Sequence, residues 1–105
     1  MAEHDADTVR DVIEDLRSAK RYHGDALDEG RSAEWDAIVE KLEGAVELLD
    51  PGRPSDVDRK GGMRLVNEAE GELRVRFGQL AAWNNEELRH AALKAAQRLY
   101  GLIGT

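Results

Sequence analysis

A short segment at residues 51–54, which reads Pro-Gly-Arg-Pro, divides the chain and holds both of its prolines. Proline lacks the backbone N–H that a helix needs and restricts the residue before it, so no helix passes through this segment. The stretches on either side, each of roughly fifty residues, contain no proline and can accommodate long helices. The break therefore ends one element firmly and forces the second stretch to begin another.

Apolar residues before the break recur at three- and four-residue spacing, which is the pattern of amphipathic helices. The first stripe predicts a helix over residues 7–27, with residues 28–30 as its end. The second predicts a helix over residues 32–50 with Ser32 as its N-cap. The first stripe consists of Val9, Val12, Ile13, Leu16, Ala19, His23 and Leu27, and the second of Trp35, Ile38, Val39, Leu42, Ala45, Val46 and Leu49.

The segment after the break admits two interpretations. Residues 55–58 can open a helical turn, and the glycine pair at 61–62 predicts an interruption. From Met63 onward apolar residues again keep helical spacing, and Glu70 and Arg74 form a favourable i,i+4 pair. We therefore expect a helix there.

The alternative for residues 63–78 is a β-hairpin. Apolar residues and arginines alternate over 73–77, and Gly71 could sit in the turn. Gly71 and Gly78 also weaken a helix, each by about 1 kcal/mol. The helix is preferred because an isolated two-stranded ribbon is only marginally stable.

The last segment predicts a helix that begins after Asn84, with Glu87 completing a capping-box-like start. Gly101 and Gly104 are expected to end it. Its apolar residues cover more than the single seam that a bundle needs, which motivates self-association or docking to a larger partner. They are Leu88, Ala91, Ala92, Leu93, Ala95, Ala96, Leu99, Tyr100, Leu102 and Ile103.

These segments together predict an all-α fold, a four-helix and mainly antiparallel bundle that forms a single helical domain over residues 1–105. No apolar run approaches the roughly 20 residues of a membrane span, so no membrane contact is expected. The acidic N-terminus fits neither a secretory nor a mitochondrial leader. The chain has no cysteine, which excludes disulfides and a cysteine nucleophile. We expect a cytoplasmic protein.

The net charge of −7 is unevenly distributed. Residues 1–50 carry 15 acidic and 6 basic side chains, a net of −9, whereas residues 51–105 carry 7 acidic and 9 basic ones, a net of +2. Nucleic acid is not an expected partner, because the acidic half repels its phosphates. Instead, the two halves are expected to pack against each other or to meet a charged partner.

A possible metal site is formed by Glu87 and His90, three residues apart on the last predicted helix. This spacing and the string around it resemble the carboxylate–histidine half-motif of ferritin-like proteins, which bind paired metal ions between helices. The resemblance implies iron or another divalent metal. No second such motif occurs in the chain, so the main expectation is that no cofactor is bound.

Arg17 and His23, separated by five residues, resemble the arginine–histidine signature of the HEPN family of helical ribonucleases. The resemblance implies a basic pair at a dimer cleft that acts on an RNA phosphate. The acidic surroundings of this pair weaken RNA binding. The alternative interpretation is that the basic residues form a solvated patch beside the apolar stripe.

The sequence offers no convergent catalytic groups, because His4, His23 and His90 lie on different segments. We therefore expect a small non-enzymatic interaction, assembly or regulatory accessory protein that acts through helical packing. Its partner would be another protein or a second copy in a homo-oligomer. The alternative is the ferritin-like metal-binding bundle, and a third possibility is an acidic mimic of nucleic acid. The expected interaction surface comprises Trp35, Trp83, Leu93, Tyr100 and Ile103.

Overall fold

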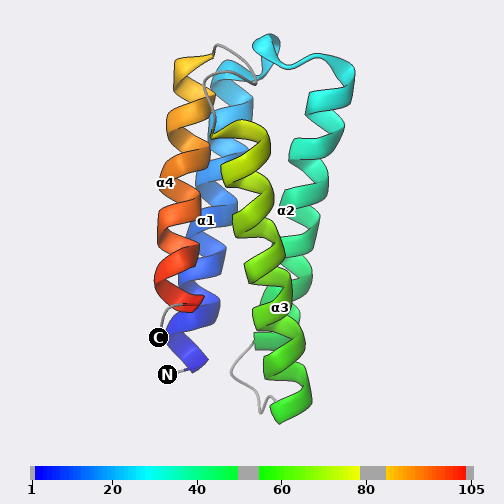
Figure 1. Cartoon of the computed structure of the whole chain (residues 1–105), viewed down its shortest axis with the longest axis vertical. Coiled ribbons are helices and arrows are strands. Elements are labelled where there is room, and N and C mark those ends of the chain that lie inside the picture. Colours follow the sequence, from blue (N-terminus) through cyan, green and yellow to red (C-terminus); the bar gives the residue numbers. More distant parts are fainter. Residues whose placement is uncertain (1, 50–54, 79–84, 104–105) are drawn as a thin grey trace.

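The computed structural model describes residues 2–49, 55–78 and 85–103. These residues form an antiparallel bundle of α1 (Ala2–His23), α2 (Glu29–Leu49), α3 (Asp56–Glu72) and α4 (Glu86–Ile103) (Figure 1). A short 3₁₀ turn, η1 (Gly24–Ala26), follows α1, and a π-helical turn, η2 (Leu73–Phe77), continues α3. The expected all-α four-helix bundle is confirmed. None of the described helices has the length and apolar character needed to cross a membrane.

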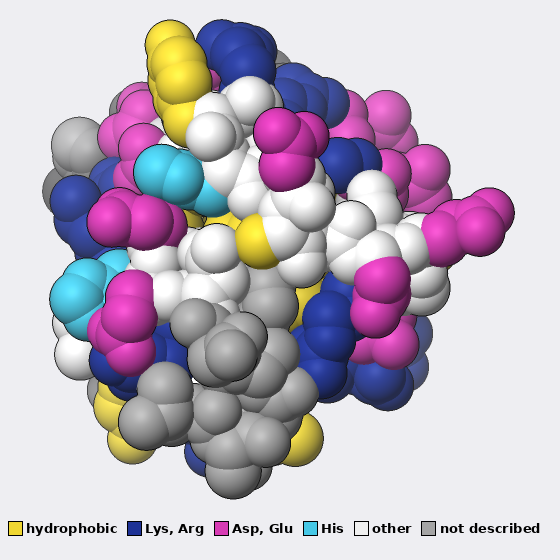
Figure 2. All heavy atoms as spheres, turned by 90° about the horizontal axis from the view of Figure 1, so that it is seen from above, with side chains coloured by type: hydrophobic (Ala, Val, Ile, Leu, Met, Phe, Trp, Pro, Cys, Tyr) yellow, Lys and Arg dark blue, Asp and Glu magenta, His cyan; other side chains and the backbone are white. Residues whose placement is uncertain are grey.

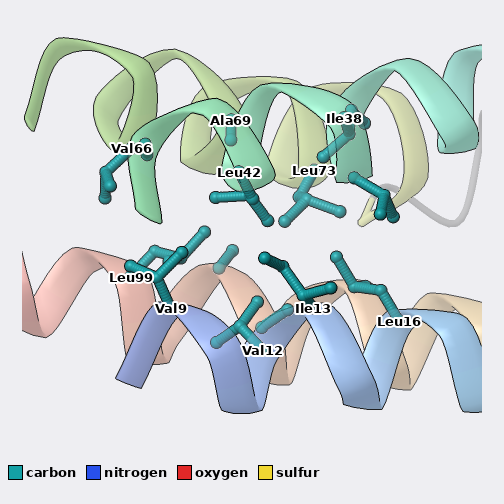
Figure 3. Close-up of a cluster of buried hydrophobic side chains, with 14 of the residues drawn as sticks. Val9, Val12, Ile13, Leu16, Ile38, Leu42, Val66, Ala69, Leu73 and Leu99 are labelled. Carbon is teal, nitrogen blue, oxygen red and sulfur yellow. The ribbon is translucent and has the colours of Figure 1, made fainter. Parts of the chain in front are cut away.

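The core lies between the α1–α4 pair and the α2–α3 pair. Each helix packs against the next one in the chain, and α4 returns to pack against α1. In Figure 3, Val9 and Val12 of α1 point toward Leu42 of α2 and Val66 of α3. Complete burial of a side chain of this size contributes about 1.5–3 kcal/mol, so these contacts are the main source of stability.

The apolar stripe of the first predicted helix faces this core as expected, with Val9, Val12, Ile13 and Leu16 all buried. The predicted boundary between the first two helices was wrong. The helix α1 ends at His23, and Asp28 is the N-cap of α2. The Asp28 carboxylate accepts a hydrogen bond from the backbone N–H of Arg31 at 2.8 Å, which satisfies a free donor of the first turn.

The segment from residue 56 to residue 77 is helical, so the alternative β-hairpin was wrong. Its first turn is capped by Ser55, whose Oγ accepts from the N–H of Asp58 at 3.1 Å. The glycine pair at 61–62 does not interrupt α3 either. Gly62 is buried against α2, and a Cβ atom there would lie only 2.8 Å from Cγ of Leu49. The missing side chain lets the two helices approach closely, and this packing outweighs the low helix propensity of glycine.

The π-helical turn η2 brings Leu73 and Phe77 into the core, where both are fully buried. The Phe77 ring meets the Trp35 ring edge to face, with centroids 5.0 Å apart and planes at 78°. At the end of η2, a Cβ on Gly78 would lie 2.7 Å from Cδ2 of Leu93. Glycine there therefore allows close packing of η2 against α4.

The start of α4 lies one residue later than expected. The Oδ1 atom of Asn85 accepts from the N–H of Leu88 at 2.9 Å, which makes Asn85 the N-cap. Gly101 lies inside α4 and does not end it. The predicted cap Asn84, the glycine at 104 and the break at 51–54 lie outside the described residues.

Candidate functional site

Trp35, expected on the interaction surface, is a core residue with only 1% of its surface exposed. Its Nε1–H donates to the backbone carbonyl of Leu16 at 3.0 Å, and its ring packs against Phe77. Trp35 lies in the second turn of α2, and its indole fills the space between α1, α2 and η2. Its polar atom is satisfied internally, and almost none of the side chain is exposed. The second expected tryptophan, Trp83, lies outside the described residues.

Leu93 and Tyr100 are brought together in an open groove between α3 and α4, with a volume of about 500 Å³. We call it the α3–α4 groove; it is lined by Glu70, Arg74, Leu93, Ala96, Gln97 and Tyr100. Tyr100 is 63% exposed, whereas Leu93 is half-buried. Ile103, also expected on this surface, is half-buried and packs against the core. Most of the apolar residues of α4 are thus packed within the bundle. Tyr100 is the large apolar side chain of α4 that stays exposed.

A buried carboxylate lies in the α3–α4 groove. Glu70 is 5% exposed, and its oxygens accept from Nε and Nη2 of Arg74 at 2.8 and 3.5 Å. The Arg74 side chain is 61% exposed. The hydrogen bond that Arg74 donates to Glu70, together with the charge of that carboxylate, raises the pKa of Arg74 above its ordinary value. Glu70 thereby orients a guanidinium that is charged at every physiological pH.

Sequence reasoning took Glu70 and Arg74 only as a helix-stabilising pair and missed the burial of the carboxylate. The spacing of the residues in the sequence nevertheless indicates that Glu70 is buried. Val66, Glu70, Leu73 and Phe77 follow one another at intervals of four, three and four residues, so Glu70 occupies a position in the apolar stripe of α3. A charged residue within such a stripe is rarely buried without a partner, and here the partner lies one turn later.

A second groove, the α1–α2 groove, lies between the first two helices. One part, of about 290 Å³, is lined by Ile13 and Val46 together with Arg10, Glu14, Arg17, Glu43 and Glu47. An adjoining part, of about 220 Å³, extends from Arg17 and Glu43 to Lys20, Trp35, Asp36, Val39 and Glu40. Arg17 donates to Glu43 at 2.8 Å, and Lys20 donates to Asp36 at 2.7 Å. The remaining glutamates of this groove make its rim predominantly acidic.

Oppositely charged side chains from the two halves of the chain form ion pairs between neighbouring helices of the bundle. Arg98 of α4 pairs with Asp15 of α1 at 2.8 Å, and Arg59 of α3 pairs with Asp5 of α1 at 3.2 Å. The charge asymmetry of the sequence is therefore used in part for packing the halves against each other. An exposed pair such as Arg98–Asp15 contributes at most about 1 kcal/mol, whereas the Asp5 carboxylate is largely buried beside Arg59.

Lys41 of α2 bridges two carboxylates of α3, with its Nζ 3.1 Å from Glu72 and 3.3 Å from Glu68. Burial alone lowers the pKa of this ammonium group. The hydrogen bonds and charges of the two glutamates outweigh that effect, so the pKa of Lys41 lies above its ordinary value. The lysine therefore acts as a charged link between the two helices.

The two residues proposed as metal ligands make separate contacts at the end of the bundle viewed in Figure 2. His23 Nε2 lies 3.9 Å from Oε2 of Glu87, whereas His90 Nε2 lies 3.6 Å from Oε2 of Glu86. Figure 2 shows histidine and acidic side chains side by side there, at the surface. A hydrogen bond from Arg89 lowers the pKa of Glu86. Within the described ranges, no group of three or more histidine, cysteine or acidic side chains is arranged to hold a metal ion.

Arg17 and His23, which resemble the HEPN signature, face different neighbours. Arg17 is engaged by Glu43 of α2, while the histidine lies beside Glu87 of α4. Arg17 and His23 are therefore not arranged here as a joint basic pair. The third histidine, His4, belongs to α1, but its side chain is outside the described part of the structure.

Comparison with protein families, with curated proteins and with solved structures finds no match to this chain.

Proposed function

We propose that this chain is a small non-enzymatic interaction protein, of the assembly or regulatory accessory class, that binds a protein partner through the α3–α4 groove. The observation that carries the proposal is the exposure of Tyr100, 63%, on a groove with an apolar floor formed by Leu93 and Ala96. Tyrosine is a preferred anchor in protein interfaces because its large, rigid ring loses little entropy on binding.

The polar groups of the groove support the same function. Arg74 is oriented by a buried carboxylate, and Gln97 provides an amide donor and acceptor on the opposite helix. An apolar floor with a few oriented polar groups is the usual composition of a specific protein interface. The groove volume, about 500 Å³, is large enough for one or two side chains of a partner.

The alternative of a metal-binding bundle gains no support from the geometry of Glu87 and His90, because each contacts a different residue. Adding ferrous iron to the purified protein and following thermal unfolding distinguishes the two functions. An interaction protein shows no shift in its midpoint, whereas a metal site on folded protein raises it by mass action.

Site-specific photo-cross-linking in the native host tests the proposed function. A photoreactive amino acid replaces Gln97, which is exposed at the groove. We expect it to capture a defined protein. Placed at Asp25, an exposed position of η1, the same probe should capture little.

Two matched substitutions complete the test. Tyr100→Ala should abolish capture, because it removes the exposed ring from the groove. Val57→Ala should leave capture unchanged, since Val57 is 78% exposed at the start of α3, away from the groove. Capture at Gln97 no stronger than at Asp25, or capture insensitive to Tyr100→Ala, would refute the proposed function.

A further inference from the structure

The α1–α2 groove and the α3–α4 groove face in opposite directions. α1 contacts α2 and α4, and α3 contacts the same two helices, so α1 and α3 occupy opposite corners of the bundle (Figure 1). The two grooves consequently lie on opposite sides of one molecule. Each remains accessible when the other is covered.

The α1–α2 groove combines a small apolar floor with a surplus of carboxylates. Ile13 and Val46 form the floor of its larger part. Arg17 and Lys20 each engage one carboxylate, at 2.8 and 2.7 Å. Exposed acidic side chains remain along the groove, and we call them the acidic rim: Glu14, Glu40 and Glu47.

The α3–α4 side carries the complementary charge. Lys60 and Arg64 lie one turn apart on α3, Arg74 follows in η2, and all three are exposed. Because Glu70 engages Arg74 only through Nε and Nη2, the Nη1 edge of the guanidinium is left for a second carboxylate.

The α3–α4 side and the α1–α2 groove are complementary in shape as well as in charge. Tyr100 projects from the α3–α4 side as a 63% exposed ring. The α1–α2 groove offers an apolar floor in a volume of about 290 Å³, which can receive one aromatic side chain. Glutamates at its edge are acceptors for the phenolic hydroxyl and for nearby cations.

From these observations we infer that the occupant of the α3–α4 groove is a second copy of this chain. The Tyr100 ring packs on Ile13 and Val46 of the second copy, and the acidic rim of that copy meets the cations of the α3–α4 side. This inference rests on the proposed function and names the partner. Because the two faces differ, the contact is head-to-tail, and each assembly retains one free face at either end.

Analytical ultracentrifugation of the purified full chain tests the inference. We expect wild-type protein to associate progressively at about 0.1 mM, with no fixed end point. Tyr100→Ala disables the α3–α4 side and Glu47→Lys disables the acidic rim, and each should weaken association by about tenfold or more. Both positions are exposed, so the variants should fold normally, which circular dichroism checks.

Mixing the two variants gives the decisive readout. Tyr100→Ala retains an intact acidic rim and Glu47→Lys retains an intact groove, so one wild-type contact forms between them. An equimolar mixture should therefore produce a dimer and nothing larger. Tyr22→Ala and Asp25→Lys are the matched changes at exposed positions outside both grooves, and they should associate like wild type.

Wild-type protein that stays monomeric would overturn the inference, as would variants that associate normally or a mixture that forms no dimer. The proposed function survives that result if Gln97 captures a different protein in the host. It fails together with the inference only if that capture is absent as well.

Discussion

The close approach of α2 and α3 at Gly62 leads to a quantitative prediction about stability. A Cβ atom at Gly62 would lie 2.8 and 2.9 Å from Cγ and Cδ2 of Leu49, and 3.2 Å from Cβ of Leu48. Ordinary carbon contacts are about 3.5–4.0 Å, so the added methyl forces the fully buried Leu49 to move. Such overpacking costs about 1–3 kcal/mol, partly offset by the helix propensity of alanine, about 1 kcal/mol.

Gly71→Ala is the matched control, because a Cβ at Gly71 meets nothing within 4 Å. Both substitutions gain helix propensity, so the difference between them isolates the packing cost. Urea unfolding followed by far-UV circular dichroism should show Gly71→Ala to be more stable than wild type by about 0.5–1 kcal/mol. Gly62→Ala should be less stable than Gly71→Ala by about 1–3 kcal/mol.

A double-mutant cycle tests the cause of this difference. Leu49→Ala opens space at the contact, so Gly62→Ala should cost less in that background than in wild type. If Gly62→Ala instead stabilises the protein as much as Gly71→Ala, the two helices are not in close contact at this point. The argument that packing keeps the glycine inside α3 would then be wrong.

Three further outcomes follow from the same structure. Trp35→Phe removes the donor to the Leu16 carbonyl and should lower the free energy of unfolding by about 1–3 kcal/mol in urea titrations, and a neutral result would contradict the buried hydrogen bond. Glu70→Leu removes a buried carboxylate and leaves the exposed Arg74 in water, so stability should stay within about 1 kcal/mol of wild type or rise, while partner capture falls. The raised pKa of Lys41 means that its pairing stabilises the fold below the ordinary lysine pKa and is lost as the pH rises through the higher folded value. Thermal unfolding at increasing alkaline pH should therefore show a loss of stability that Lys41→Met does not show, and parallel profiles for the two proteins would count against the bridge.

Local patterns in the sequence predicted the number, type and order of the helices. The stripes of α1 and α2 contain the buried residues of those helices except Ala6, because an amphipathic helix must bury its apolar face in any bundle. Helix ends were predicted less well. Ser32 and Asp28 are both good N-caps, and the choice depends on where α1 ends, which is a property of the packed chain.

The positions of the candidate-site residues were also predicted only in part. Tyr100 and Leu93 were predicted on the interaction surface, and the structure places both in the α3–α4 groove. Trp35 was assigned to that surface and is buried instead. Tryptophan is favourable both in a core and at an interface. The choice depends on the packing of Phe77, which lies far away in the chain.

The sequence alone determined that this chain forms an all-α bundle, because both long stretches lack proline and carry helical apolar periodicity. It also determined that opposite charges of the two halves would be available to pair. Tertiary structure alone decided that Gly62 lies inside α3, that Glu70 is buried beside Arg74, and that the two grooves lie on opposite sides. Each of these features arises where two helices meet, and the distance between helices is not encoded in the local pattern of either one.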